Sequence, residues 1–279
     1  MTVKVLFLKI GFLGMTPLIE ALLDERANRK DLAIRVVSSG VKLKEEDAKT
    51  VLQSLPKEEF DLVVLVAPNS GVSGPAVAWK ELSKKRKALV VISDSPLKKS
   101  VAELESLGIG YIVIEADSML GARREFLDPV EMALFNSEII KVLAVTGVFR
   151  RVQKELDKLI RDAGEGRKSE LPRLVLDKEV VLTDAGLSNP YAVAKAIASF
   201  EIAMRVGAMS AEGLYKVKER ERYLPIVAAA HEMMRHAGLL ADEAREIEKA
   251  GDRVMRAMHL DDGRIVSKVE LMDSLETAE

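Results

Sequence analysis

Short apolar runs alternate with amphipathic stretches over the first 116 residues of the chain. The apolar runs have the length of strands and are rich in β-branched residues; they cover residues 3–10, 33–37, 62–67, 89–93 and 109–114. Between them, apolar residues recur at helical spacing in residues 15–27, 44–55, 75–85 and 97–107. Strands that are apolar throughout and separated by helices are typical of a parallel sheet with helices on both faces. The pattern therefore predicts an α/β fold with a Rossmann-like, mostly parallel sheet.

The rest of the chain has mainly helical periodicity. Residues 129–161 predict one long or kinked helix. A polar linker at 163–170 leads to residues 171–182, which are apolar enough to return one strand to the sheet. Further helices are predicted over residues 189–206 and 225–250.

Near the end of the chain, Asp262 and Gly263 separate two β-rich runs, and an Asp-Gly pair in this position predicts a tight hairpin turn. We therefore expect three parts: an α/β domain over residues 1–120, a mainly helical bundle portion over 121–250, and a short C-terminal β hairpin and tail over 251–279.

Composition limits the classes of protein that this chain can represent. With 279 residues, 48% apolar and 31% charged, it is typical of a soluble globular protein with a sizeable core. A net charge of −2 and an aromatic content of 4% argue against a nucleic-acid partner. The chain has no cysteine, which excludes disulfides, thiolate metal sites and cysteine nucleophiles.

The apolar run at the start of the chain is interrupted by Lys4 and Lys9, and no small-residue cleavage site follows it. It therefore predicts a first strand rather than a signal peptide. No run reaches the ~18 apolar residues that a membrane-spanning helix needs. We expect a cytoplasmic protein with no membrane partner.

A charged loop precedes the strongest helix start in the chain. Asp128 can cap the exposed amides, and Pro129 suits the first helical position. Glu131 occupies the position from which a capping-box carboxylate reaches back. Such a positively polarised helix end suits an anionic ligand. The charged residues just ahead of it are Arg123, Arg124 and Glu125.

The first strand leads into a loop that contains Lys9, Gly11 and Gly14, with Thr16 at the next helix start. Two glycines let the backbone bend tightly and bring its amides close to a ligand. A nicotinamide fingerprint, G-x-G-x-x-G, would need a middle glycine that is missing here. The loop is therefore equally consistent with a phosphate or carboxylate site and with a plain tight turn.

Polar and turn-forming residues also follow three other predicted strands. Ligands of open α/β sheets bind outside the carboxyl ends of the strands. Each of these ends alone favours a structural explanation, but three of them at one edge favour a ligand cleft. The residues are Pro68 and Asn69, Asp94 and Ser95, and Asp117 and Met119.

The segment from His231 to His236 resembles a zinc-protease motif without matching it. Zinc binding by H-E-x-x-H needs two histidines four residues apart on one helical face. Here Arg235 occupies the second histidine position, and His236 is rotated by about 140° from His231. No metal site is predicted. His231, Glu232 and Arg235 either line a pocket or belong to a solvated helix face.

Five segments spread over nearly the whole chain together carry a family resemblance: residues 9–14, 117–136 (DSMLGARREFLDPVEMALFN), 141–150, 189–192 and 221–235. They resemble the archaeal family of coenzyme F-420 (F420)-dependent methylenetetrahydromethanopterin dehydrogenases. The resemblance implies reversible hydride transfer between methylenetetrahydromethanopterin and the oxidised deazaflavin coenzyme, which acts as a cosubstrate in methanogenic one-carbon metabolism. It also implies that neither a metal nor a tightly bound flavin takes part, and that the chain forms a homohexamer built as a trimer of dimers.

With this chemistry, we expect the glycine loop, the strand ends and the arginine pair to bind the coenzyme, and the following helices to contribute to the pterin site. A carboxylate, Glu125 or Asp94, would favour the cationic product electrostatically. The expected coenzyme residues are Lys9, Gly11, Gly14, Thr16, Pro68, Asn69, Asp94, Ser95, Asp117, Met119, Arg123 and Arg124. The expected substrate residues are Glu125, Asp128, Asn136, His231 and Arg235.

Two other functions compete with this interpretation. One is an NAD(P)-dependent dehydrogenase on a similar fold, against which the incomplete glycine fingerprint argues. The other is a non-catalytic, ligand-binding oligomer, in which the arginine pair would affect assembly or ligand affinity alone.

Overall fold

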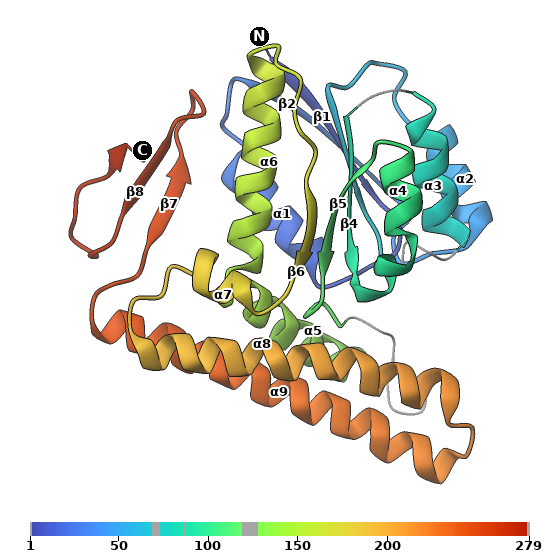
Figure 1. The fold of residues 1–279 in the computed structure, drawn as a ribbon, viewed down its shortest axis with the longest axis vertical. Helices are drawn as coiled ribbons and strands as arrows, with labels where there is room; N and C mark the ends of the chain where they lie inside the picture. Colours follow the sequence, from blue (N-terminus) through green and yellow to red (C-terminus); the bar gives the residue numbers. More distant parts are fainter. Residues whose placement is uncertain (1, 69–72, 86–87, 119–127, 278–279) are drawn as a thin grey trace. The chain divides into compact units, whose positions relative to one another are not determined.

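The computed structural model describes residues 2–68, 73–85, 88–118 and 128–277, and its elements are drawn in Figure 1. The strands are β1 (Val3–Lys9), β2 (Leu32–Ser38), β3 (Leu62–Val66), β4 (Ala88–Asp94), β5 (Gly110–Ile114), β6 (Arg173–Leu176), β7 (Arg256–His259), β8 (Ile265–Lys268) and β9 (Glu276–Thr277). The helices are α1 (Met15–Glu25), α2 (Glu45–Gln53), α3 (Ser73–Ser83), η1 (Ser95–Ser100), α4 (Val101–Ser106), α5 (Pro129–Val145), α6 (Val148–Gly164), α7 (Glu179–Asp184), α8 (Pro190–Ala211), η2 (Glu212–Lys216) and α9 (Arg220–Ala250).

The first six strands form one parallel sheet in the order β2-β1-β3-β4-β5-β6. Every residue of β3 and β5 is buried, as the uninterrupted apolar runs predicted. Helices α2, α3 and α4 contribute to the apolar core on one face of the sheet, and α1 and α6 lie on the opposite side (Figure 1). The predicted α/β fold with a parallel sheet is confirmed.

The strand order places a topological switch point between β1 and β3. From β1 the chain proceeds to β2 on one side of it, and β3 then pairs with its other side. In doubly wound sheets of this order, the crevice outside the carboxyl ends of these two central strands is the usual ligand site.

The predicted long or kinked helix over residues 129–161 is two helices, α5 and α6, bent by 62°. The bend occurs at Gly147, which has a φ of 88°, and a side chain there would lie 2.5 Å from the backbone nitrogen of Ala185. Among the described residues no single helix is long and apolar enough to cross a membrane, and α5 and α6 meet that test only when taken together across their bend.

Two elements, β6 and α9, differ from the predicted pattern. Only Arg173–Leu176 of the apolar run at 171–182 forms a strand, β6, which pairs with β5. Asp177 then accepts a hydrogen bond from the Glu179 amide at 2.9 Å, and the chain turns into helix α7. The last helix begins at Arg220 rather than near residue 225, and Pro225 lies in its second turn.

A buried carboxylate joins the end of α9 to the beginning of α8. Glu248 is 2% exposed and accepts hydrogen bonds from the Ser188 amide at 2.8 Å, the Ser188 hydroxyl at 2.9 Å and the Asn189 amide at 2.7 Å. Asn189 in turn caps α8 through the amide of Tyr191, which confirms the predicted helix start. Ser199 also donates to the Ala237 carbonyl at 2.7 Å, so α8 and α9 are linked along their length.

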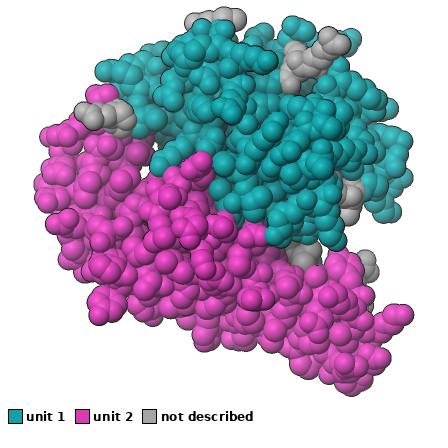
Figure 2. All heavy atoms as spheres, viewed as in Figure 1, with its two compact units in different colours: residues 1–114, 152–176, 259–265 teal, residues 115–151, 177–258, 266–279 magenta. Residues whose placement is uncertain are grey.

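The chain divides into two compact units (Figure 2). Unit 1 contains residues 1–114, 152–176 and 259–265, and unit 2 contains residues 115–151, 177–258 and 266–279. These bounds differ from the three consecutive ranges expected from the sequence, because β6 returns to the sheet after α6. The predicted C-terminal β segment is a three-stranded sheet of β7, β8 and β9, with Gly263 at a φ of 84° before β8.

A buried ionic cluster within unit 1 fastens the segment that begins at His259. The Nδ1 of His259 lies 2.9 Å from Glu25 Oε1, and its Nε2 lies 3.3 Å from Asp157 Oδ1. Arg26 donates two hydrogen bonds to Asp157, at 2.8 and 3.0 Å. A pair of hydrogen bonds from Arg29 to Asp31 lies beside this cluster. Because both ring nitrogens of His259 face carboxylates, the arrangement suits the doubly protonated imidazolium.

The pKa values of His259, Asp157 and Glu25 differ from their ordinary values in the directions that favour a charged histidine between two charged carboxylates. Burial alone would lower the pKa of His259, but hydrogen bonds to Asp157 and Glu25 outweigh it and raise that pKa above 6.5. Burial alone would raise the pKa of Asp157 and of Glu25, but hydrogen bonds from His259 and the nearby arginine charge lower both. The cluster therefore favours the fully ionised state.

We expect the melting temperature to pass through a plateau and fall on both sides of it. The raised pKa of His259 adds stability that is complete below pH 6.5 and is lost as the pH rises through the folded-state value. The lowered pKa values of Glu25 and Asp157 add stability above pH 4.5 and 3.8, which is lost at lower pH. Calorimetry from about pH 2 to about pH 9 measures both declines.

The control is His236→Gln, which alters an exposed histidine on α9 whose ring contacts the carbonyl of Glu232 on the same helix. His259→Gln should remove most of the alkaline decline, whereas His236→Gln should keep it. An unchanged alkaline decline in His259→Gln would contradict the assignment of this loss to His259.

Candidate functional site

The carboxyl ends of β1 and β3 meet at a loop that is closely packed by the protein itself. Gly11 has a φ of 73°, a conformation that favours glycine. A side chain at Gly11 would collide with the side chain of Leu43 and lie 3.2 Å from Pro68 Cγ. The structure therefore brings two predicted coenzyme residues, Gly11 and Pro68, together at the switch point.

Backbone amides of this loop are already hydrogen-bonded within the protein. The Gly11 amide donates to Ser39 Oγ at 3.0 Å, and the Leu13 amide donates to Thr16 Oγ1 at 3.1 Å. Thr16 is buried, and Gly14 occupies the cap position of α1. A phosphate nest needs several amides directed at the ligand. The amides of Gly11 and Leu13 instead donate to side-chain oxygens of the protein itself, those of Ser39 and Thr16.

Charged and polar side chains follow the strands of the same edge. Lys9, the last residue of β1, forms an ion pair with Glu20 of α1, and its side chain is 11% exposed. Asp94, the last residue of β4, is 3% exposed, and Ser93 donates to it at 3.2 Å. Ser95 is half-buried at the start of η1. Lys9 and Asp94 therefore place one positive and one negative charge at the carboxyl ends of the strands, while the interior of the sheet stays covered.

In unit 2, the predicted start of α5 is confirmed. Asp128 Oδ1 accepts hydrogen bonds from the Val130 amide at 2.7 Å and the Glu131 amide at 2.9 Å, and Pro129 occupies the first turn. The Glu131 carboxylate, which the capping-box pattern directed back to the cap, lies instead 2.9 Å from Nδ1 of His231.

His231 is buried between two residues of α5. Its ring stacks on Phe135 with the centroids 4.1 Å apart, while Glu131 holds its Nδ1. Arg235, one turn further along α9, is exposed and pairs with Glu232 of the same helix at 3.3 Å. Of the two alternatives for this segment, the solvated helix face applies to Arg235, whereas His231 is packed between helices; whether His231 lines a pocket stays a prediction.

Two further predicted positions of unit 2 contain buried polar atoms. Asp117 and Ser118 are each 3% exposed, and Ser118 packs against Gly207 of α8. Ser118 Oγ and Asn136 Oδ1 have no hydrogen-bond partner in the described part of the chain. The predicted positions Asn69, Met119, Arg123, Arg124 and Glu125 lie outside the described residues.

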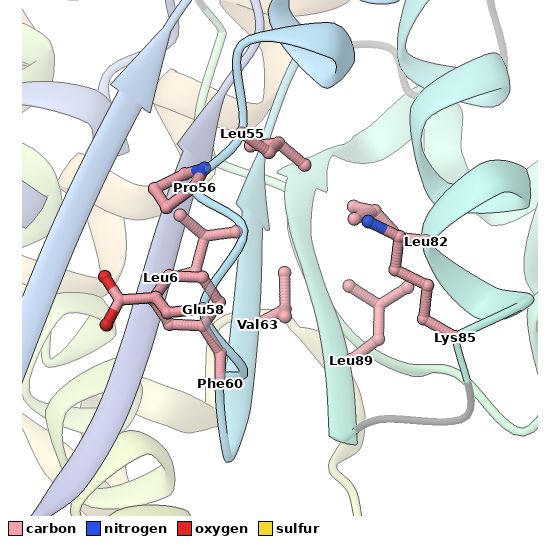
Figure 3. A pocket seen from close by; sticks show the side chains of 9 residues that line it. All are labelled: Leu6, Leu55, Pro56, Glu58, Phe60, Val63, Leu82, Lys85 and Leu89. Carbon is pink, nitrogen blue, oxygen red and sulfur yellow. The ribbon is translucent and has the colours of Figure 1, made fainter.

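A small cavity in unit 1 is lined by Leu6, Leu55, Pro56, Glu58, Phe60, Val63, Leu82, Lys85 and Leu89 (Figure 3). Its volume is about 40 Å³, which is sufficient for very few water molecules. Val63 and Leu89 are near the beginnings of β3 and β4, at the opposite edge from the switch point. This cavity is therefore too small and wrongly placed to be the ligand site. Within the described ranges, no three His, Asp or Glu residues are grouped as metal ligands.

Ser39 and Leu43 are parts of this site that the sequence reasoning missed. Ser39 follows β2 directly, so the strand-end criterion that selected Pro68 and Asp94 could also have found it. The sequence contains no comparable signal for Leu43, because its contact with Gly11 joins two segments that are distant in the chain.

Comparisons with known proteins identify close relatives over nearly the full length. Residues 3–276 match the family model described as methylene-5,6,7,8-tetrahydromethanopterin dehydrogenase. The F420-dependent methylenetetrahydromethanopterin dehydrogenase of Archaeoglobus fulgidus is 50% identical over 272 residues, with 98% of each chain covered. The enzyme of the same name from Methanocaldococcus jannaschii is 46% identical and covers 99% of this chain and 100% of its own.

A solved structure resembles the whole chain as well. The TM-score is 0.94 at 46% sequence identity, and the match covers 99% of this chain and 100% of the other. That structure is an F420-dependent methylene-tetrahydromethanopterin dehydrogenase in complex with methylene-tetrahydromethanopterin and coenzyme F420.

The different burial of His231 and Arg235 predicts different costs of truncation. His231→Ala removes a stacked, hydrogen-bonded ring from between α5 and α9 and should lower the free energy of unfolding by about 2–3 kcal/mol. Arg235→Ala removes an exposed ion pair within one helix and should change it by less than about 0.5 kcal/mol. Urea unfolding followed by circular dichroism measures both, and equal losses would show that Arg235 has contacts beyond Glu232.

Proposed function

The chain belongs to the methylene-5,6,7,8-tetrahydromethanopterin dehydrogenase family, and on this basis we propose that it transfers hydride reversibly between methylenetetrahydromethanopterin and oxidised coenzyme F420. The products are methenyltetrahydromethanopterin and the reduced coenzyme. The observation that carries the proposal is an identity of 46–50% to enzymes of this name over at least 98% of the chain. The protein is thus an oxidoreductase of archaeal one-carbon metabolism and methanogenesis.

The protein's task in this reaction is orientation and exclusion of water. The deazaflavin, when bound, supplies a carbon that accepts two electrons with one hydrogen as hydride. The donor and acceptor carbons must be held at about 3–3.5 Å. Side chains and backbone at the site therefore promote hydride transfer mainly by holding the two ligands in the correct geometry and by placing fixed charges near them.

We place the coenzyme at the carboxyl edge of the sheet in unit 1. The residues there suit a flat ring with an anionic tail. Leu43 and Phe12 are half-buried and apolar beside the glycine loop, and Lys42 and Lys44 are exposed cations between β2 and α2. Phosphate and carboxylates of a tail would meet these ammonium groups rather than backbone amides.

The same geometry argues against the NAD(P)-dependent alternative. A dinucleotide site presents amides of the glycine loop to the pyrophosphate. Here Ser39 and Thr16 accept the hydrogen bonds of the Gly11 and Leu13 amides, and the middle glycine of the fingerprint is missing. The non-catalytic alternative has no specific observation in its favour.

The remaining proposed site residues are assigned to the cationic product and to the pterin according to their charge and burial. Asp94 carries a buried carboxyl group at a strand end and is the described candidate for electrostatic stabilisation of the cationic methenyl product. Asn136 of unit 2 is our first candidate for a pterin contact, because its Oδ1 is buried without a partner among the described residues. His231 stays in the proposed pterin set, with its ring held by Glu131 and Phe135. Glu125, Asp128 and Arg235 remain in the proposed pterin set.

We also propose that the protein is a cytoplasmic homohexamer, a trimer of dimers. Most of the large apolar side chains exposed among the described residues belong to unit 2. They concentrate around the C-terminal sheet, where Met272 is 90% exposed. Clusters of this kind commonly become buried between subunits. The side chains in this region are Met255, Met258, Val269, Leu271, Met272 and Leu275.

The activity can be tested with the purified protein under anaerobic conditions. Mixing it with methylenetetrahydromethanopterin and oxidised coenzyme F420 should bleach the visible deazaflavin band, and methenyltetrahydromethanopterin with the reduced coenzyme should restore it. NADP in place of F420 should give no turnover. Absence of turnover with F420, or robust NADP reduction, would reject the proposed function.

The oligomer can be tested by light scattering after size-exclusion chromatography. The unmodified protein should elute at six times the chain mass of 30.7 kDa. Leu271→Lys combined with Met272→Lys should shift it to smaller species, because charges in a subunit interface are costly to bury. Val36→Lys combined with Val41→Lys, at exposed positions of unit 1, is the control and should leave the mass unchanged. A monomer for the unmodified protein would exclude the hexamer.

A further inference from the structure

Residues 39–44, here called the strap, connect β2 to α2 and pack against the loop that follows β1. The Ser39 amide donates to the Lys9 carbonyl at 3.0 Å, and the Ser39 hydroxyl accepts from the Gly11 amide at 3.0 Å. The same hydroxyl donates to the Lys42 carbonyl at 2.8 Å. Ser39 therefore links the strap to both sides of Ile10, and its hydroxyl acts as donor and acceptor at once.

Leu43 anchors the other end of the strap. Its side chain occupies the space that a Cβ at Gly11 would need, and its carbonyl oxygen occupies the corresponding space at Gly74 of α3. Leu43 thus lies against the residues that follow β1 and begin α3. Both glycines are explained by close approach of the strap rather than by a ligand.

Within the described ranges, the Gly11 amide donates to one acceptor, the Ser39 hydroxyl of the strap, and Gly11 itself is buried. A buried amide that loses its acceptor is costly, so removal of the Ser39 hydroxyl should make the loop move toward water or another acceptor. The loop leads directly into the amino end of α1, whose partial positive charge favours an anionic group placed near it. Displacement of this loop would therefore change the shape of the protein surface at the carboxyl ends of β1 and β3, where we place the coenzyme.

We propose that Ser39 is a positioning residue for coenzyme F420, which acts by holding Gly11 and the following loop in the shape that the coenzyme requires. The hydroxyl of Ser39 is already used twice within the protein, so its effect is transmitted through Gly11 and not by contact with the coenzyme. Leu43 supports the same loop by packing. This inference rests on the proposed function, in particular on the coenzyme position at the switch point.

The test compares Ser39→Ala with the unmodified enzyme. The KM for F420 and the Kd for F420, measured by quenching of its fluorescence, should each rise about fivefold or more. The kcat at saturating F420 and the KM for methylenetetrahydromethanopterin should remain within about twofold, because orientation of the pterin does not depend on the strap. Hydrogen exchange at the Gly11 amide should accelerate in the variant, and F420 should slow it in the unmodified enzyme.

Matched variants separate positioning from general loss of structure. Ser39→Thr keeps the hydroxyl and should restore the F420 affinity. Ser38→Ala removes the neighbouring hydroxyl, which accepts from the Gly40 amide at 3.0 Å, and should leave F420 affinity unchanged. If Ser39→Ala does not fold, Ser39→Cys keeps the test valid, because the weaker acceptor sulfur should give an intermediate rise in the KM for F420.

Two results would overturn the inference. The first is an F420 affinity of Ser39→Ala within twofold of the unmodified enzyme. The second is a parallel rise in the KM for F420 and for the pterin, since this would show a general distortion. Turnover by the unmodified enzyme is measured first, so failure of the proposed function is recognised separately from failure of the role of Ser39.

Discussion

Burial of the central strands of the parallel sheet is the constraint on which the rest of the structure depends. Every residue of β3 and β5 is buried, so a polar side chain inside either strand would lose water without gaining a partner. In the central strands β1, β3, β4 and β5, charged side chains therefore lie only near the strand ends. Lys9 and Asp94 are the last residues of β1 and β4, at the edge where we propose that the coenzyme binds.

At this edge the protein satisfies several of its own polar groups before any ligand arrives. The amides of Gly11 and Leu13 donate to Ser39 and Thr16, and the Lys9 ammonium pairs with Glu20. A coenzyme at the switch point would therefore meet apolar surface and side-chain charge more than exposed backbone. This arrangement differs from a dinucleotide fold in its hydrogen bonds although the order of the strands is of the same general kind.

The same requirement of satisfied polar groups joins distant segments elsewhere. Glu248 receives three hydrogen bonds from Ser188 and Asn189, and His259 lies between the carboxylates of Glu25 and Asp157. In each case a buried charge is tolerated because partners from another part of the chain surround it. Such contacts give a unique position to helices and to the C-terminal segment that apolar packing alone would hold less specifically.

The sequence by itself determined the α/β class, the positions of five strands, the capped start of α5 and the family resemblance. These follow from local patterns: apolar runs for buried strands, Asp128 with Pro129 for a helix start, and long matching segments for the family. Only the tertiary structure decided that Glu131 holds His231 rather than its own cap, that the returning strand β6 pairs with β5, and that Ser39 holds the Gly11 amide. The physical reason is that each of these contacts joins segments far apart in the chain. Hydrogen-bond partners and close packing at such distances depend on the path of the whole backbone, which local periodicity and spacing do not contain.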